Sequence, residues 1–338
     1  MKLEVDITFA LLKSAIFGGD AEVPPLDANH WWSLFRLLQR NHVAALCFDA
    51  VSKSGAPRDV LMPWLSEHEK AVEWHRYQQQ VQQEIIDRMQ QQGIETLVLK
   101  GTHTAQYYPR PEEREFGDLD LYFYDRHADA DRVAREVLRA SVSNDAQHHS
   151  KYNYRGVTVE SHYDFVNCHY PPSNRRYETL LKEQAPNATF EMLFLLRHMA
   201  GHFAASRITL RDLVDWTLTC HALADKADWE TVQNAIEEYG MLEFAASLNS
   251  IASRRFGIQL PCNLTGNTAS LSLVEHDIVY GTMDDHSGNG IGRLGWKLRR
   301  WRALGWKRKM VYNDSSLRLM LSSLTSHTMK PQSILHKQ

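Results

Sequence analysis

The segment 118–124 alternates strictly between two kinds of residue, and this pattern constrains the fold of the chain most. Asp118 and Asp120 share one face with two tyrosines, whereas the other face is apolar: Leu119, Leu121 and Phe123. Because successive side chains of a strand point to opposite sides, a period of two predicts a β-strand with one buried face. The sequence therefore predicts a sheet that carries carboxylates on its second face.

Two further segments predict strands around this one. Residues 96–99 form a short apolar run between turn signals, which is typical of a buried strand. Residues 152–165 predict a hairpin that turns near residues 155–156. Its second arm places three polar residues on one face: Thr158, Glu160 and His162. Together these segments predict a small mixed α/β unit over residues 93–170.

Helical spacing dominates the rest of the chain. A Gln-rich segment at 77–92 predicts one long helix, which Gly93 would end. After residue 171, the helical period returns in three segments: 190–221, 229–256 and 271–280. The chain of 338 residues is 43% hydrophobic and 23% charged, which excludes disordered, collagen-like and coiled-coil classes as global descriptions.

These patterns predict an α+β fold in three regions. A small mixed β-sheet core at 93–170 would be flanked by an N-terminal helical region at 1–92 and a C-terminal helical region at 171–338.

Asp118, Asp120 and Glu160 are the candidate metal ligands. Residues i and i+2 of a strand lie roughly 7 Å apart on one face, so the two aspartates can converge on one divalent cation or a pair. Hard cations such as Mg²⁺ prefer carboxylate oxygens. The sequence shows no matching set of cations, so a bound metal would relieve the repulsion among three carboxylates. An Asp-x-Asp pair alone is more typical of a solvated strand face than of a metal site.

The turn after residues 96–99 supplies a candidate phosphate site. Lys100, Gly101 and Thr102 stand between a predicted strand and a predicted helix at 101–108. Free N–H groups at a helix N-terminus bind phosphate, and glycine permits close approach. Lys100 and Thr102 add a cation and a hydroxyl, whereas the GxxxxGK[ST] spacing of a P-loop is absent.

The phosphate turn, the Asp-x-Asp strand and the third acidic strand, in this order, resemble the polymerase-beta-like nucleotidyltransferase superfamily. The sequence LKGTHTAQYYPRPEEREFGDLDLYF, followed by VTVESHYDF, looks like an uncharacterised bacterial nucleotidyltransferase family with an LKG turn. Most of the superfamily has Gly-Ser in the turn and a shorter gap to the first Asp. Here the turn is Gly-Thr, and 16 residues separate Gly101 from Asp118.

The resemblance implies that residues 93–170 are a nucleotidyltransferase core, and it implies roles for the site residues. The catalytic residues and metal ligands would be Asp118, Asp120 and Glu160. The nucleotide-binding residues would be Lys100, Gly101, Thr102 and Arg114.

The predicted activity is Mg²⁺-dependent transfer of an NMP group from an NTP, such as ATP, to an acceptor hydroxyl, with release of pyrophosphate. Two Mg²⁺ ions would activate the acceptor oxygen and stabilise the leaving group. The acceptor stays open among a small molecule, a protein and an RNA end. The alternative is a non-catalytic NTP-sensing or protein-binding module that retains the fold, because fold does not fix function.

Charge and cysteine content bear on location and partners. The net charge of −3 gives no global attraction to nucleic acid or anionic lipid. The four cysteines form no CxxC pair, which fits a reducing compartment. No apolar run reaches the roughly 18 residues of a membrane span, and acidic residues precede the first apolar stretch, unlike in a signal peptide. We therefore expect a cytoplasmic protein without a membrane partner.

Residues 293–309 carry eight Lys and Arg residues and no acidic residue. One interpretation is a helix packed through Leu294 and Trp301, with a solvated basic face. The other is that the stretch from Arg293 to Lys309 binds an anionic partner, such as nucleic acid or an acidic protein.

His198 and His202 stand four residues apart on a predicted helix, a spacing that can ligate zinc. Met199 stands where an HExxH site has its glutamate, which favours a packing role for both histidines.

Overall fold

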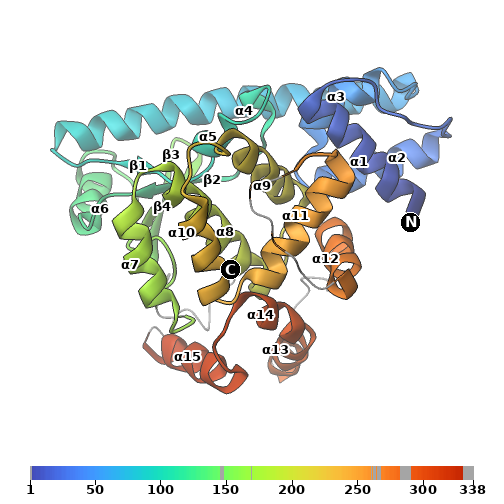
Figure 1. The fold of residues 1–338 in the computed structure, drawn as a ribbon. Helices are drawn as coiled ribbons and strands as arrows, with labels where there is room; N and C mark the ends of the chain where they lie inside the picture. The colour runs from blue at the N-terminus through green and yellow to red at the C-terminus, as the bar shows by residue number, and fades with distance from the viewer. Residues whose placement is uncertain are drawn as a thin grey trace. The chain divides into compact units, whose positions relative to one another are not determined.

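The computed structural model describes residues 2–144, 148–168, 170–259, 261, 264, 268–281 and 291–329. The chain divides into two compact units, whose elements are labelled in Figure 1. The helical unit comprises Met1–His68 and Pro186–Asn313, and the sheet unit comprises Glu69–Ala185 and Asp314–Gln338. Both predicted helical regions thus contribute to the helical unit, while residues 69–92 join the sheet unit.

The sheet unit is built around a four-stranded mixed sheet with the strand order β1-β2-β4-β3. Its strands are β1 (Leu97–Val98), β2 (Asp118–Tyr122), β3 (His149–Tyr154) and β4 (Val157–His162). Strand β2 pairs antiparallel with β1 and parallel with β4. Strands β3 and β4 form the predicted hairpin. It turns at Arg155 and Gly156, whose φ angles of 51° and 82° match the positive values that a two-residue type I′ turn requires.

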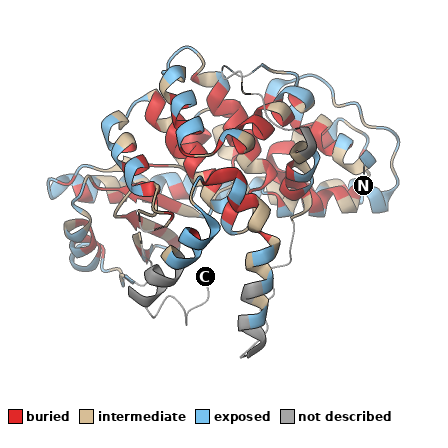
Figure 2. Cartoon of the chain, turned by 60° about the horizontal axis from the view of Figure 1, so that its bottom comes forward, coloured by how far each residue is buried: buried red, intermediate tan, exposed pale blue. Residues whose placement is uncertain are grey.

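One face of this sheet is buried in an apolar core. Helix α4 (Arg58–Gln91) contributes Val81 and Ile85, and helix α6 (His127–Glu136) contributes Val133. Strand β2 contributes Leu119 and Leu121, and Phe123 follows directly after it. Burying one such side chain stabilises the fold by about 1.5–3 kcal/mol. Figure 2 shows the buried residues in red where elements pack together and the exposed residues in pale blue on the outer sides of helices. Because its apolar face is held in this core, β2 carries Asp118 and Asp120 on the other face.

Helix α4 ends where the sequence predicts. Gly93 has a φ of 67°, and the N–H of Ile94 donates to the carbonyl oxygen of Met89, which closes the last turn. The remaining elements of the sheet unit are α5 (Thr102–Ala105), the 3₁₀ helix η1 (Pro111–Glu113), α7 (Asn174–Gln184) and α15 (Ser316–Met329).

The helical unit contains the first turns of α4 and ten further helices among its described residues. They are α1 (Lys2–Phe17), α2 (Ala28–Arg40), α3 (Ala44–Ser52), α8 (Ala188–Ala205), α9 (Leu210–Ala222), α10 (Trp229–Glu238), α11 (Leu242–Phe256), α12 (Thr268–Tyr280), α13 (Ile291–Ala303) and α14 (Gly305–Val311). The predicted helix at 190–221 is interrupted between α8 and α9. Thr209 and Asp212 form a capping box there, which satisfies backbone N–H groups at the start of α9.

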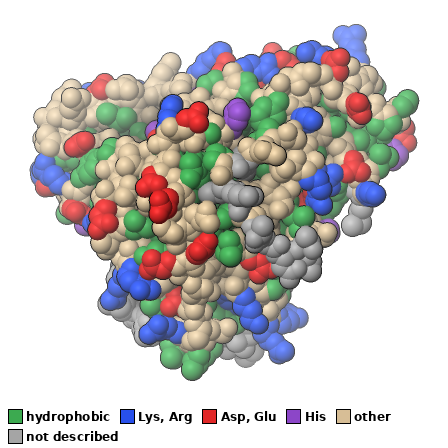
Figure 3. Space-filling view, in the orientation of Figure 1, with side chains coloured by type: hydrophobic (Ala, Val, Ile, Leu, Met, Phe, Trp, Pro, Cys, Tyr) green, Lys and Arg blue, Asp and Glu red, His purple; other side chains and the backbone are tan. Residues whose placement is uncertain are grey.

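The predicted fold class is confirmed: the protein is α+β, with a small mixed sheet flanked by helices. Within the described ranges, no helix combines the length and the apolar character needed to cross a bilayer. Lys and Arg side chains are interspersed with Asp and Glu over the face seen in Figure 3, in keeping with the near-neutral net charge.

Candidate active site

Carboxylates from two neighbouring strands meet on the polar face of the sheet. Strands β2 and β4 run parallel, and their register sets Asp120 directly beside Glu160. Asp118 lies two residues before Asp120 on β2 and shares its face. The three side chains differ in exposure, at 42% for Asp118, 9% for Asp120 and 17% for Glu160. The structure thus brings together all three predicted acidic residues, with Asp118 at the solvent-exposed end.

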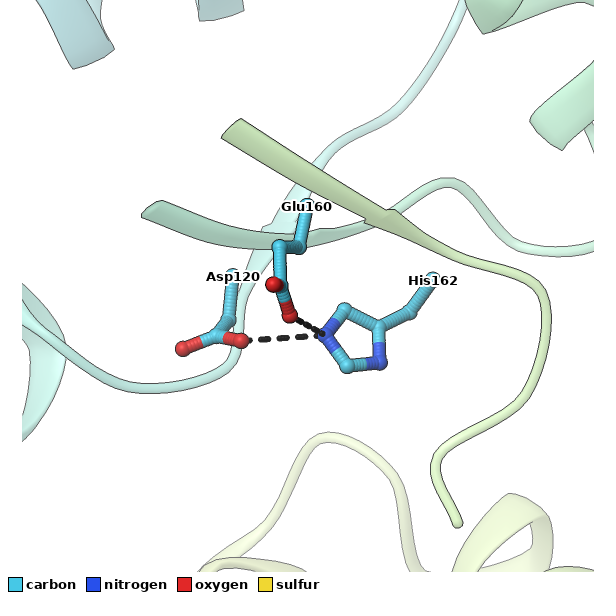
Figure 4. Close-up of side chains that lie close together, drawn as sticks. All are labelled: Asp120, Glu160 and His162. Atoms are coloured by element: carbon cyan, nitrogen blue, oxygen red, sulfur yellow. Dashed lines mark hydrogen bonds and ion pairs between the residues drawn. The ribbon is translucent and has the colours of Figure 1, made fainter. Parts of the chain in front are cut away.

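His162 joins this group from the next polar position of β4. Its Nε2 atom lies 3.0 Å from Asp120 Oδ1 and 3.9 Å from Glu160 Oε2 (Figure 4). The ring is buried, with 3% of the side chain exposed. One atom each from His162, Asp120 and Glu160 lie within 4.8 Å of one another, so these residues could hold a metal ion. This role of His162 was not predicted from the sequence, although the alternation of residues 157–162 places His162 on the same face as Glu160.

Two lysines also reach the carboxylates, which corrects the expectation that no cations match them. The Nζ atom of Lys151 lies 3.1 Å from Glu160 Oε1 and 3.3 Å from Asp118 Oδ2. The Nζ atom of Lys100 lies 3.4 Å from Asp120 Oδ2. Lys151 was missed because it lies on β3, which begins three residues before the predicted hairpin. Sequence proximity alone does not show that β3 sets it opposite Glu160.

Burial and charge change the proton affinities of this group. Burial raises the pKa of Glu160, and the negative charge of Asp120 raises it further. For Lys151, burial acts to lower the pKa, but the hydrogen bond and charge of Glu160 outweigh burial, so the pKa is raised. Burial lowers the pKa of His149 on β3 to about 4, and the nearby His162 and Lys151 act in the same direction. Glu160 is therefore the acid of this group that takes up a proton more readily than usual.

The turn with Lys100, Gly101 and Thr102 is tightly built. Gly101 has a φ of 66°, and a Cβ atom there would lie 3.3 Å from the ring of Phe116. The positive φ favours glycine at this position, and a Cβ atom would also require the ring of Phe116 to shift slightly. The hydroxyl of Thr102 donates to Gln82 Oε1 at 2.6 Å. The following helix α5 has only four residues and ends before the predicted limit at residue 108.

Arg114, which the resemblance implies to be a nucleotide-binding residue, is buried. Only 4% of the residue is exposed, and its Nη1 donates to the carbonyl oxygen of Gly101 at 3.3 Å. Arg114, in the loop that leads to β2, therefore stabilises the glycine turn through this hydrogen bond.

A second group of possible ligands lies at the start of α7 and the preceding loop. Atoms of Asp164, Cys168 and Glu178 lie within 4.8 Å of one another. Burial, together with the charge of Glu178, raises the pKa of Asp164 to about 7. Burial likewise raises the pKa of the Cys168 thiol, so this thiol stays protonated and is a poor nucleophile or metal ligand. His169, its neighbour in sequence, lies outside the described residues.

The basic segment 293–309 forms parts of α13 and α14 in the helical unit. Lys307 is fully buried, and its Nζ lies 2.6 Å from Asp277 Oδ2. The guanidinium of Arg308 stacks on the ring of Trp301 at 3.7 Å. Two of the predicted basic side chains are therefore internal, while Arg299, Arg302 and Lys309 are exposed. The side chain of Leu294 lies outside those that the structure describes.

The rings of His198 and His202 on α8 pack together with their centroids 4.4 Å apart. Within the described residues, neither belongs to a group of three or more possible metal ligands.

The comparison with known proteins agrees with the geometry of the sheet face. Residues 27–257 match the family described as "Uncharacterised nucleotidyltransferase". No curated protein and no solved structure matches the chain. The matched range covers more than half of the 338 residues and includes the glycine turn and all three carboxylates. The chain therefore belongs to a family of uncharacterised nucleotidyltransferases.

Proposed function

We propose that the protein transfers an NMP group from an NTP to a hydroxyl of an acceptor. The acceptor oxygen would attack the α-phosphorus, the bond to the β-phosphate would break, and pyrophosphate would leave. The acceptor class stays open among small molecules, proteins and RNA ends.

The observation that carries this proposal is the register of two parallel strands, which sets Asp120 beside Glu160 with Asp118 on the same face. Asp120, Glu160 and His162 offer ligand atoms within 4.8 Å of one another, a donor set that could hold a divalent cation, and Asp118 lies on the same face. Asp118, Asp120 and Glu160 would hold the cation or cations, Mg²⁺ being the ion expected. A bound cation supplies charge neutralisation for the transferred group and the leaving pyrophosphate.

The other residues of the site have separate tasks in this proposal. Glu160, whose pKa is raised, would accept the proton of the acceptor hydroxyl. The turn at Lys100, Gly101 and Thr102 would contact the triphosphate. Arg114 would act by holding Gly101, because its guanidinium donates to the Gly101 carbonyl oxygen.

The competing function is a non-catalytic module that binds NTP or protein. One observation favours it: Lys100 and Lys151 already pair with the carboxylates, so the face can be neutralised without a metal ion. In that case NTP would bind equally with and without Mg²⁺, and no pyrophosphate would form.

Two measurements separate the functions. The first is equilibrium binding of each NTP, with and without Mg²⁺. The second is pyrophosphate release in a cell extract with labelled NTP, followed by mass spectrometry to identify the modified acceptor. We expect Mg²⁺-dependent release that Asp120→Asn lowers by about 10²–10³-fold, the usual effect of removing one preorganised charge from such a site. Wild-type turnover in Asp120→Asn would show that the metal-site assignment is wrong.

A further inference from the structure

We propose that Gln78, on the buried face of α4, is a positioning residue that fixes Asp118 relative to the glycine turn. Gln78 belongs to the part of α4 that lies in the sheet unit. It acts through Gly117, which directly precedes Asp118. The inference rests on the proposed function, because it names a residue on which the geometry of that site depends.

The first argument is the hydrogen bond that Gln78 makes. Its Nε2 atom donates to the carbonyl oxygen of Gly117 at 2.9 Å. A carbonyl oxygen only accepts, so the nitrogen of the side-chain amide is the atom that faces it. The peptide group that carries this oxygen also contains the N–H of Asp118, the first residue of β2. The hydrogen bond therefore holds the backbone at the point where the first aspartate leaves the loop.

The second argument is that the same face of α4 also holds the segments on either side. One turn before Gln78, the Nδ1 atom of His75 lies 3.4 Å from the carbonyl oxygen of Arg114. One turn after it, Gln82 accepts a hydrogen bond from the hydroxyl of Thr102 at 2.6 Å. Residues three and four apart share one face of a helix, so these three side chains form a single row. The row contacts both the glycine turn and the loop that leads to β2, and it holds the two segments in a fixed relation.

The third argument is that polar side chains stand where the apolar stripe of α4 would continue. Val81, Ile85 and Met89 are the apolar members of this face. Towards the N-terminus, Gln78 and His75 follow at the same spacing, with 0% and 2% exposed. Among the described residues, Gln78 Oε1 and His75 Nε2 have no hydrogen-bond partner, a cost that an apolar side chain would avoid. Stability alone would favour an apolar residue at position 78, so the amide is explained by the loop that it holds.

The test uses the full-length protein and the variant Gln78→Met, whose unbranched side chain can fill the same space but cannot donate a hydrogen bond. Gly117 is exposed, so its carbonyl oxygen can bind water in this variant. The unfolding temperature should therefore equal or exceed that of the wild type. Amide hydrogen exchange in residues 114–118, measured without nucleotide or metal, should become about 10-fold faster or more, because this segment has lost its anchor.

Pyrophosphate release from labelled NTP in the cell extract gives the second readout. At saturating NTP the rate of Gln78→Met should fall by about 10–100-fold, because a displacement of about 1 Å at a reacting group has an effect of this size. The KM for NTP should change by less than about 3-fold, because the glycine turn keeps its own contact with Gln82. The matched control is Gln79→Met, the same substitution at an exposed position of the same helix. It should behave like the wild type in both measurements.

Three results would each overturn the proposal: a lower unfolding temperature or loss of folding in Gln78→Met, exchange in residues 114–118 at the wild-type rate, or a saturated rate within about 3-fold of the wild type. The first of these would show that Gln78 only supports the fold. All three leave the transferase proposal standing if the wild type releases pyrophosphate. Conversely, faster exchange in Gln78→Met, without pyrophosphate release by the wild type with any NTP, would keep Gln78 as the residue that fixes the start of β2 and reject the transferase.

Discussion

Lys151 and Glu160 face each other across the β3–β4 ladder, and Lys151 Nζ lies 3.1 Å from Glu160 Oε1. The same ammonium reaches Asp118 Oδ2 at 3.3 Å. A positive charge of the chain itself therefore bridges two of the three carboxylates. A divalent cation that uses Asp118 and Glu160 must compete with this lysine.

Replacing Lys151 by methionine should tighten the binding of divalent cations. The lysine side chain is 48% exposed, so solvent screens its charge and its removal is worth only about 1 kcal/mol, or about five-fold in the dissociation constant. Calorimetric titration of Mg²⁺ and Mn²⁺ measures this. Lys151→Arg keeps the charge and should bind like the wild type. Weaker binding in Lys151→Met would mean that Lys151 helps to shape the site.

The two aspartates of β2 should differ in their effect on stability. Asp120 pairs with both Lys100 and His162 and is buried, so Asp120→Ala should lower the free energy of unfolding by about 1–3 kcal/mol. Asp118 is 42% exposed, so Asp118→Ala should change it by less than about 0.5 kcal/mol. Urea unfolding without metal measures both. Equal losses of unfolding free energy in Asp118→Ala and Asp120→Ala would contradict this argument from burial.

The buried pair of Lys307 and Asp277 should be essential to the helical unit. Lys307 Nζ also donates to the carbonyl oxygen of Ser206 at 2.6 Å. Lys307→Met removes the ammonium that pairs with the buried carboxylate of Asp277, which should cost about 3–5 kcal/mol. Thermal unfolding of Lys307→Met, Asp277→Leu and the double variant gives the coupling energy, and the double variant should be more stable than the sum of the single effects predicts.

The control for this pair is Lys309→Ala. Lys309 lies on the same helix and is exposed, so its removal should change the free energy of unfolding by less than about 0.5 kcal/mol. If Lys309→Ala lowers the free energy of unfolding as much as Lys307→Met does, then α14 is sensitive to the loss of any positive charge.

The protein should lose stability in acid because of His75, a buried residue of α4. Burial lowers the pKa of this histidine below its ordinary value of 6.5. The unfolded chain then binds a proton more readily than the folded protein, so the stability is fully present above about pH 6.5 and is lost as the pH falls from there through the lowered pKa. The difference in unfolding free energy between the wild type and His75→Asn should therefore shrink from pH 7.5 to pH 5. A difference that does not change with pH would contradict the lowered pKa.

The polar face of β2 could be predicted because its alternation is local. The residues Leu119 and Leu121 have to enter a core, and this forces Asp118 and Asp120 to the other side. The pairing of Asp120 with Glu160 could not be derived from periodicity, since it depends on β2 and β4 being parallel neighbours. Glu160 was predicted as the third ligand from the polar face of its own strand, and the order of the motifs, which resembles that of a known superfamily, supported this prediction.

Lys151 shows why other parts of the site could not be predicted from the sequence. Its role depends on the start of β3, and the segment before residue 152 has no apolar alternation strong enough to reveal a strand. Arg114 was predicted as a nucleotide-binding residue, but its burial beside Phe116 and Gly101 was not, because a loop arginine is usually exposed. The break between α8 and α9 depends on the capping box at Thr209, which outweighs the helical period on both sides.

The parallel pairing of β2 with β4 also determines when the carboxylates can meet as the chain folds. The β3–β4 hairpin closes over two residues, whereas parallel strands must wait for a long crossover to be ordered. A chain that has formed only the hairpin has Glu160 and His162 in place but lacks Asp120. An ion that needs all three residues recognises the finished sheet alone, so its binding free energy is added to the native state. Such an ion should therefore slow unfolding and leave the rate of folding almost unchanged.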